Sequence, residues 1–179
     1  MPDWIITPCV PAELPAVVDL VNSAYRGDGA EVGWTTEADY IDGQRTNLAD
    51  LTEELAGEPT PTLLVMRRDA GSEILACAMV EPHLEDGYAY LGMITVRPGL
   101  QAGGVGRAML QAAEDHAAAL GAARAQMTVV HIRDSLIAWY QRRGYRLTGE
   151  RKPFPYDDAR FGTPKVAGLV FVVLEKPLT

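Results

Sequence analysis

Apolar residues recur every three or four positions in four stretches of this chain, which is the spacing of residues on one face of a helix. Residues 104–120 show it best, and Gly121 ends that stretch. The core-facing positions expected there are Met109, Leu110, Ala113, Ala117 and Leu120. Residues 11–25, 46–55 and 134–143 share the spacing, so we predict four helices.

Short polar residues mark the starts of two of these helices. Asn47 precedes the second helix and Asp134 opens the fourth, and side chains of this kind cap exposed N–H groups. We expect both residues to act as caps, with Gly57 and Gly144 after the helix ends. The apolar stripe expected on the second helix is Leu48, Leu51 and Leu55.

Seven shorter runs, bounded by turn residues, have the character of strands. They are residues 3–8, 62–67, 74–82, 88–96, 124–130, 145–148 and 168–174. The order is a helical pair, then a run of strands, then alternating strands and helices. That order predicts an α/β fold with helices on both sides of the sheet. No linker or repeat divides the chain, so we expect one domain over residues 1–179.

Composition narrows the class of protein. Hydrophobic residues make up 47% of the chain and charged residues 22%, which is typical of a folded domain. The net charge of −8 disfavours nucleic acids and anionic membranes as partners. The N-terminus lacks the pattern of a signal peptide, and Cys9 and Cys77 have no spacing typical of a disulfide framework or a metal site. We therefore expect no metal and a cytoplasmic location.

A glycine-rich turn joins the strand at 88–96 to the longest helix. Pro98 ends the strand, because proline cannot donate to a sheet ladder. Glycines then expose backbone N–H groups where the helix dipole is positive, which suits an anion such as pyrophosphate. These glycines are Gly103, Gly104 and Gly106, with Arg97 and Arg107 nearby. A plain glycine loop before an alanine-rich helix is the alternative, since short glycine motifs are weakly specific.

Two motifs resemble those of a known family. Gln101-x-x-Gly104-x-Gly106 resembles the pyrophosphate-binding motif of GNAT acetyltransferases. Downstream, Tyr140-x-x-x-Gly144-Tyr145 resembles the signature that closes the same cofactor site. The resemblance covers residues 91–145. The resemblance implies a GNAT fold, with a mixed and mostly antiparallel sheet of six to seven strands, and acetyl-CoA as cosubstrate.

The resemblance also implies a set of site residues. Backbone groups of the strand end would pair with the pantetheine arm, and those of the turn would hold the pyrophosphate. These cofactor-binding positions are Ile94, Thr95, Val96, Gln101, Ala102, Gly103, Gly104, Val105, Gly106 and Arg107. Arg133 stands where many members have an Asn that bonds the pantetheine. Tyr140 would be the catalytic acid that protonates the leaving thiolate, because a tyrosine of pKa about 10 is protonated at neutral pH.

The acceptor site is less specified. Some family members carry a Glu base on the strand before the turn, and Tyr90 stands there in this chain. The expected substrate-binding residues are Tyr25, Trp34, Glu37, Glu81 and Tyr90. The candidate bases are Glu31, Glu37, Glu81, His83 and His131, and a water chain is an equal alternative.

We therefore predict an N-acetyltransferase that uses acetyl-CoA, or a close acyl-CoA, to acylate a primary amine by direct transfer in a ternary complex. The expected acceptor is a small molecule, and a peptide N-terminus or a lysine is the alternative acceptor. A non-catalytic acyl-CoA-binding or regulatory module on the same fold is the first alternative. A dinucleotide-binding protein is the second, and the position of the glycine turn in mid-chain weighs against it. Dimers are common among such folds, and nothing in this sequence specifies one.

Overall fold

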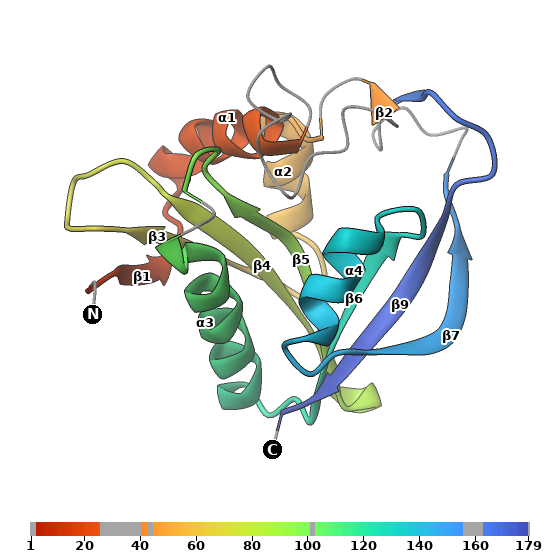
Figure 1. The fold of residues 1–179 in the computed structure, drawn as a ribbon. Coiled ribbons are helices and arrows are strands. Elements are labelled where there is room, and N and C mark those ends of the chain that lie inside the picture. Colours follow the sequence, from red (N-terminus) through yellow and green to blue (C-terminus); the bar gives the residue numbers. More distant parts are fainter. Residues whose placement is uncertain (1–2, 26–40, 43–44, 101–102, 156–162, 179) are drawn as a thin grey trace.

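The computed structural model describes residues 3–25, 41–42, 45–100, 103–155 and 163–178. Its helices are α1 (Leu14–Tyr25), α2 (Leu48–Leu55), α3 (Val105–Ala119) and α4 (Asp134–Gln141). The strands of the large sheet are β1 (Ile5–Pro8), β3 (Thr62–Arg67), β4 (Ala76–His83), β5 (Tyr88–Val96), β6 (Arg124–Val130), β7 (Arg146–Pro153) and β9 (Val170–Pro177). Two short strands, β2 (Ile41–Asp42) and β8 (Thr163–Pro164), pair separately (Figure 1).

The seven strands lie in the order β1-β3-β4-β5-β6-β9-β7. Neighbouring strands are antiparallel except β5 and β6, which are parallel. The expected mixed, mostly antiparallel sheet is therefore confirmed. No helix in the described part of the chain is long and apolar enough to cross a membrane.

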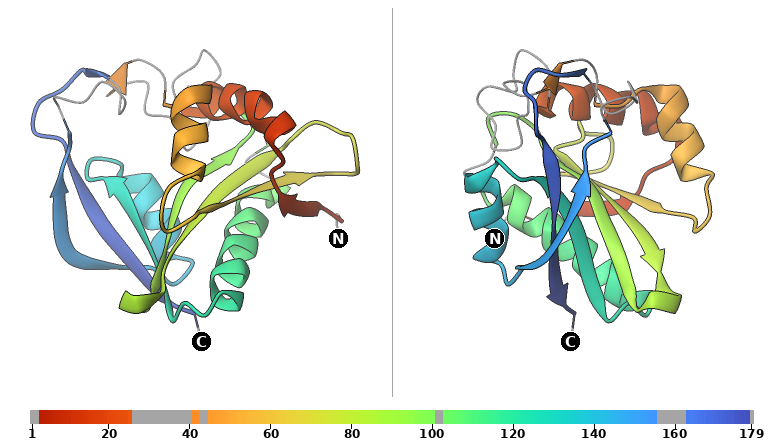
Figure 2. Two further views of the ribbon diagram at one scale, coloured as in Figure 1. Left: turned by 180° about the vertical axis from the view of Figure 1, so that it is seen from behind. Right: turned by 90° about the vertical axis from the view of Figure 1, so that its right-hand side faces the viewer.

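Helices cover both faces of the sheet, as predicted (Figures 1 and 2). On one face, α3 and α4 pack on β4, β5 and β6 through a large core that includes Met109, Leu110 and Tyr145. On the other face, α1 and α2 form a smaller core around Val17, Leu51 and other buried residues. Complete burial of a valine or leucine side chain contributes roughly 1.5–3 kcal/mol to the free energy of unfolding. These two cores hold the sheet between rigid layers.

Three details of the helix prediction are wrong. Leu48 and Leu120 are 47% and 39% exposed. Leu48 is the first residue of α2 and Leu120 is the C-cap of α3, so both lie at helix ends that project from the core. Asp134 is also not the cap of α4: Arg133 occupies the N-cap position, and no side chain caps that end. Asn47 does cap α2, because its side chain accepts a hydrogen bond from the Asp50 N–H.

The sheet divides at its parallel pair. Strands β5 and β6 pair only at three positions, from Tyr88 opposite Arg124 to Tyr90 opposite Gln126. Beyond these positions the two strands part toward the top of Figure 1. The registry between β4 and β5 also shifts by one residue between Cys77 and Met79, and Met93 has a φ of 51°. This β-bulge bends β5 away from β6 where they separate.

Candidate active site

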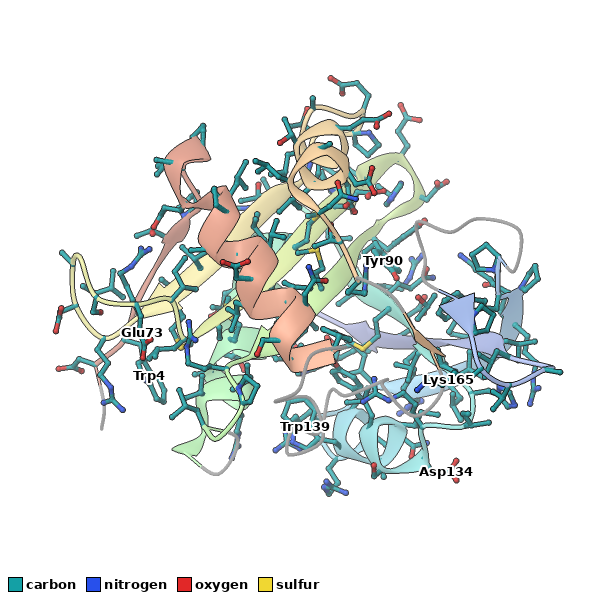
Figure 3. All side chains as sticks on the ribbon, turned by 90° about the horizontal axis from the view of Figure 1, so that it is seen from above. Trp4, Glu73, Tyr90, Asp134, Trp139 and Lys165 are labelled. Atoms are coloured by element: carbon teal, nitrogen blue, oxygen red, sulfur yellow. The ribbon has the colours of Figure 1, made fainter. Side chains whose placement is uncertain are left out.

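A cavity of about 580 Å³ lies between the diverging strands. Residues of β4, β5 and β6 form its floor, with Tyr90 where the two halves of the sheet meet (Figure 3). On the N-terminal side the wall comprises Tyr25, Arg45, Thr46, Asp50, Glu53 and Glu54. On the other side it comprises Arg133, Leu136, Tyr140, Phe154 and Phe171. The expected residues Tyr25, Glu81, Tyr90, Ile94, Arg133 and Tyr140 therefore all reach one cavity.

After the bulge, some backbone N–H and C=O groups of β5 point away from β4. The Tyr25 hydroxyl donates to the Ile94 carbonyl over 2.8 Å, which shows that this carbonyl faces the α1 and β6 side. The Arg97 N–H donates to the Leu75 carbonyl over 2.8 Å, toward β4. Because backbone direction alternates along a strand, Val96 faces the same side as Ile94. An extended ligand could therefore pair with this edge.

The backbone groups of the three predicted strand-end residues do not all point in the same direction. Ile94, Thr95 and Val96 are all buried, and the Thr95 hydroxyl donates to the Met93 carbonyl over 2.9 Å. Thr95 pairs with Cys77, so its backbone faces β4. Only Ile94 and Val96 keep their backbone groups on the edge that β6 leaves open.

The glycine turn follows at the end of this edge. Gly104 is the N-cap of α3, with a φ of 78° that favours glycine, and no side chain caps the helix. A Cβ placed on Gly103 or Gly104 would meet nothing within 4 Å, so the space in front of the turn is open. The first turn of α3 supplies the N–H groups of Val105, Gly106 and Arg107, which have no partner inside the helix. Gln101 and Ala102 lie outside the described residues.

Arginine side chains lie near the glycine turn and add positive charge to it. Arg107 is exposed in the first turn of α3. Desolvation lowers the pKa of Arg143, and the nearby guanidinium groups of Arg107 and Arg142 lower it further. Arg97 contributes less than the sequence suggested, because its guanidinium donates to the Ile74 carbonyl over 2.6 Å. Open space, an uncapped helix start and clustered arginines together fit a phosphorylated ligand.

Tyr140 reaches the cavity from α4. Its side chain is 5% exposed and packs edge-on against the Tyr145 ring at 5.8 Å. Burial raises the pKa of Tyr140 well above its ordinary value, and Tyr25 adds to this while Arg133 opposes it. Among the described residues, no hydrogen bond to its hydroxyl is formed. The phenol is therefore protonated at neutral pH and available to a ligand.

Arg133 lies beside Tyr140, at the N-terminus of α4. It is only 7% exposed, and its backbone N–H donates to the Val130 carbonyl over 3.0 Å. Its backbone carbonyl in turn accepts from the Ile137 N–H over 3.0 Å. The end of β6 and the first turn of α4 thus hold a buried cation at the cavity wall.

The residues that the sequence predicts for the acceptor site are held by polar contacts. The Tyr90 hydroxyl lies 2.6 Å from the Thr128 hydroxyl across the floor. Glu81 lies 2.7 Å from the ring of His83. His131 is instead engaged with the Val170 backbone at 3.2 Å, which argues against it as a base. Glu31, Trp34 and Glu37 lie outside the described residues, so their assignments stay predictions.

Sequence reasoning missed several lining residues. Asp50, Glu53 and Glu54 project from α2 into the cavity wall, and Thr128 reaches it from β6. The only signal was a run of carboxylates on the polar face of α2, which is the usual pattern of a solvated helix face. Their role depends on what α2 packs beside, which the local pattern does not encode.

The cysteines do not provide a nucleophile. Both are free thiols. Burial raises the pKa of Cys77 to about 12 and that of Cys9 to about 11. A raised pKa leaves very little thiolate at neutral pH. Neither residue lines the cavity.

Comparison with known structures supports the same reading of the fold. The chain is similar to the ribosomal-protein-S18-alanine N-acetyltransferase from Escherichia coli, with a TM-score of 0.67, 19% identity, and 99% of this chain and 95% of that chain covered. It is similar to the ribosomal-protein-alanine N-acetyltransferase from Brucella melitensis, with a TM-score of 0.68, 17% identity, and coverages of 97% and 99%. For nourseothricin acetyltransferase the TM-score is 0.67, the identity 19%, and the coverages 98% and 99%.

At these identities the solved structures establish the fold alone. No match is found among curated proteins. The sequence profile of the Acetyltransferase (GNAT) family, however, matches residues 16–145, which include most of α1, the glycine turn and Tyr140. This chain therefore belongs to the GNAT acetyltransferase family and is an enzyme of the acetyltransferase class.

Proposed function

We propose that this enzyme transfers an acetyl group from acetyl-CoA to a primary amine of a small molecule, directly and in a ternary complex. One observation carries the proposal. The backbone edge at Ile94 and Val96, which β6 leaves unpaired and where only the Tyr25 hydroxyl contacts the Ile94 carbonyl among the described residues, leads from the cavity to the uncapped glycine turn at Gly104. An extended thioester with a diphosphate fits such a path, because amide groups can pair with the strand and phosphates with the turn.

The roles of the chain's own groups follow from this placement. The bound cosubstrate supplies the activated acyl group. The N–H groups of Val105, Gly106 and Arg107 hold phosphate, and the strand edge aligns the arm beside it. The Tyr140 hydroxyl donates a proton to the departing sulfur. Direct transfer needs no enzyme nucleophile, in agreement with the high pKa values of both thiols.

The attacking amine must first lose a proton. Among the described residues, Glu81 is the only candidate base from the sequence that lines the cavity. The His83 ring nitrogen lies 2.7 Å from the Glu81 carboxylate, on the same strand. A proton taken up by Glu81 can therefore pass to His83. We therefore assign Glu81 as the acceptor of that proton.

Gly104→Glu tests the proposal. A carboxylate in front of the turn should repel the phosphates, and the left-handed backbone adds strain of about 1 kcal/mol. We expect the variant to lose most of its acetyl-CoA binding, measured by calorimetry, and its thiol release with primary amines.

Gly71→Glu is the matched control. Gly71 has a φ of 85° and the same open surroundings, but it lies in the turn between β3 and β4. The control should be destabilised to a similar degree and keep its affinity for acetyl-CoA. Equal affinity in both variants would remove the phosphate site. Binding of acetyl-CoA without turnover of any primary amine would instead favour a non-catalytic module.

A further inference from the structure

The acceptor wall of the cavity carries a strong excess of negative charge. We use this name for the N-terminal wall described above together with Glu81 on the adjoining floor, and it carries the carboxylates of Asp50, Glu53, Glu54 and Glu81 against the single guanidinium of Arg45. Three of the four come from α2, and they lie at the opposite side of the cavity from Arg133. The excess is local, because Arg133 and Tyr140 form the other wall.

These carboxylates are not neutralised by the protein. Within the described ranges, Asp50, Glu53 and Glu54 form no ion pair, and Glu81 contacts only His83. Arg45 is directed over the Tyr25 ring, 5.6 Å from its centroid. Asp50 does accept from the Asn47 side chain over 2.8 Å, but that donor is neutral.

The charges also act on one another. Desolvation raises the pKa of Glu54, and the negative charges of Glu81 and Asp50 raise it further, while Arg45 opposes this. Glu54 and Glu81 belong to different elements, α2 and β4, so the fold itself brings them together. A cation between them would relieve the repulsion.

A second observation shows that the same cavity is built for a ligand. Tyr140 is 95% buried, lines the cavity, and has no hydrogen-bond partner in the described part of the chain. Its hydroxyl is reached from the cavity rather than enclosed in the core, so a bound ligand can supply the hydrogen bond that the protein does not. The acidic wall and this hydroxyl therefore face a single ligand-sized space.

We propose that the acceptor is a small dication, a diamine or polyamine-like molecule, whose second ammonium group binds at Glu54 with Asp50 and Glu53. This rests on the proposed function. The amine near Glu81 and Tyr140 reacts, and the distal ammonium remains charged at the α2 wall. A monoamine would occupy only the reacting end, because it has no second charge to pair with the partly exposed carboxylates of α2.

The test compares amines of equal length that differ in one charge, namely 1,4-diaminobutane and n-butylamine, by kcat/KM in a thiol-release assay. We expect the diamine to be preferred by about tenfold or more, which corresponds to about 1.4 kcal/mol. Glu54→Gln should reduce this preference several-fold. Raising the salt concentration should also reduce it, because salt screens partly exposed charges.

Glu150→Gln is the matched control, since it removes the same charge from β7 outside the cavity wall. It should keep the wild-type preference. Equal kcat/KM for the two amines, or a preference unchanged in Glu54→Gln, would overturn the dication proposal and leave the acetyltransfer to amines intact. No thiol release with any primary amine would overturn both.

Discussion

Tyr140 and Tyr145 show how two buried tyrosines of one motif differ in what they do. The Tyr145 hydroxyl donates to Glu114 over 2.9 Å, and Lys176 donates to the same carboxylate over 2.8 Å. This buried network joins α3, the end of α4 and β9. Tyr140 has no such partner among the described residues and faces the cavity instead. The Tyr145 hydroxyl is bound within the framework, whereas the Tyr140 hydroxyl lies at the cavity without a partner in the described part of the chain.

Tyr140→Phe separates these roles. Loss of the hydroxyl should lower kcat by about 10²-fold, the usual contribution of a positioned acid. Affinity for CoA and the midpoint of thermal unfolding should change little, because the lost hydroxyl has no protein partner. Steady-state kinetics with thiol detection provides the measurement.

Tyr145→Phe is the corresponding control. It should reduce the free energy of unfolding by about 1–2 kcal/mol, because it removes a hydrogen bond to a buried carboxylate. Its kcat should fall far less than that of Tyr140→Phe. Normal turnover in Tyr140→Phe would exclude that residue as the acid.

The sequence was informative about residues within motifs and uninformative about those outside them. The motif around Tyr140 placed this residue beside the expected cofactor, and the structure has it on the cavity wall, while its catalytic role stays a prediction. The acidic residues of α2 were missed, because their environment is created by β4 and by the bend of β5. The cap was misplaced at Asp134 because helix starts are uncertain by a residue or so without knowledge of the preceding strand.

At the scale of elements, one side chain joins α1 to the segment before α2. The Asn22 side-chain oxygen accepts from the N–H groups of Arg45 and Thr46 over 2.7 and 3.1 Å. Its amide donates back to the Thr46 carbonyl over 2.9 Å. These three bonds set the position of Arg45 and of the start of α2, and hence of the acidic wall.

Asn22→Ala should therefore lower the free energy of unfolding by about 1–3 kcal/mol, since it leaves partly buried backbone groups without partners. It should also raise the KM for the amine more than that for acetyl-CoA, because α2 lines the wall at which we propose that the amine binds. Asn22→Asp, which keeps both accepted bonds, should recover part of the stability. Equal changes in both KM values would show that the contact has no specific effect on the acceptor wall.

Strand positions were predicted well where turns bound them. The limits of β3, β5 and β6 agree with the sequence pattern at both ends. Strand β9 continues to Pro177, beyond the predicted residue 174, because it pairs with β6 as far as Arg124. Strand β7 likewise continues to Pro153 through a shifted register with β9. Pairing between distant segments extends strands past their local signal.

At the scale of the whole molecule, buried thiols and phenols link stability to alkaline pH. Burial raises the pKa of Cys77 from the ordinary 9.0 to about 12. It also raises the pKa values of Tyr140 and Tyr145 above the ordinary 10.0. Above pH 9, these thiol and phenol groups therefore keep their protons in the folded state and lose them in the unfolded state. This contribution is fully present below pH 9 and is lost as pH rises toward the folded-state values.

The free energy of unfolding should accordingly fall above pH 9, by about 1 kcal/mol per pH unit for Cys77 alone. Urea titrations at pH 7.5, 9 and 10 provide the measurement. Cys77→Ala should show a shallower decline between pH 9 and 10, where the tyrosines contribute least. The same slope in both proteins would show that Cys77 does not retain its proton.

The arrangement of the sheet was the least predictable feature. The alternation of strands and helices indicated the fold class, and the motifs indicated the family. The separation of β5 from β6 depends on a parallel pairing of only three positions, between strands joined through α3. No local pattern of apolar residues specifies where such a pairing stops.

The bulge in β5 has a consequence for anyone who aligns or redesigns such chains. Before it, Ala89 and Leu91 point into the α3 and α4 core; after it, Ile94 and Val96 do. The inward positions thus change from odd to even numbers within one strand. An alignment without a gap at Met93, made against a regular strand, would assign every later residue to the wrong layer. Deleting that single residue would remove the bulge and restore regular alternation, with Ile94 and Val96 still on the face that α3 and α4 cover.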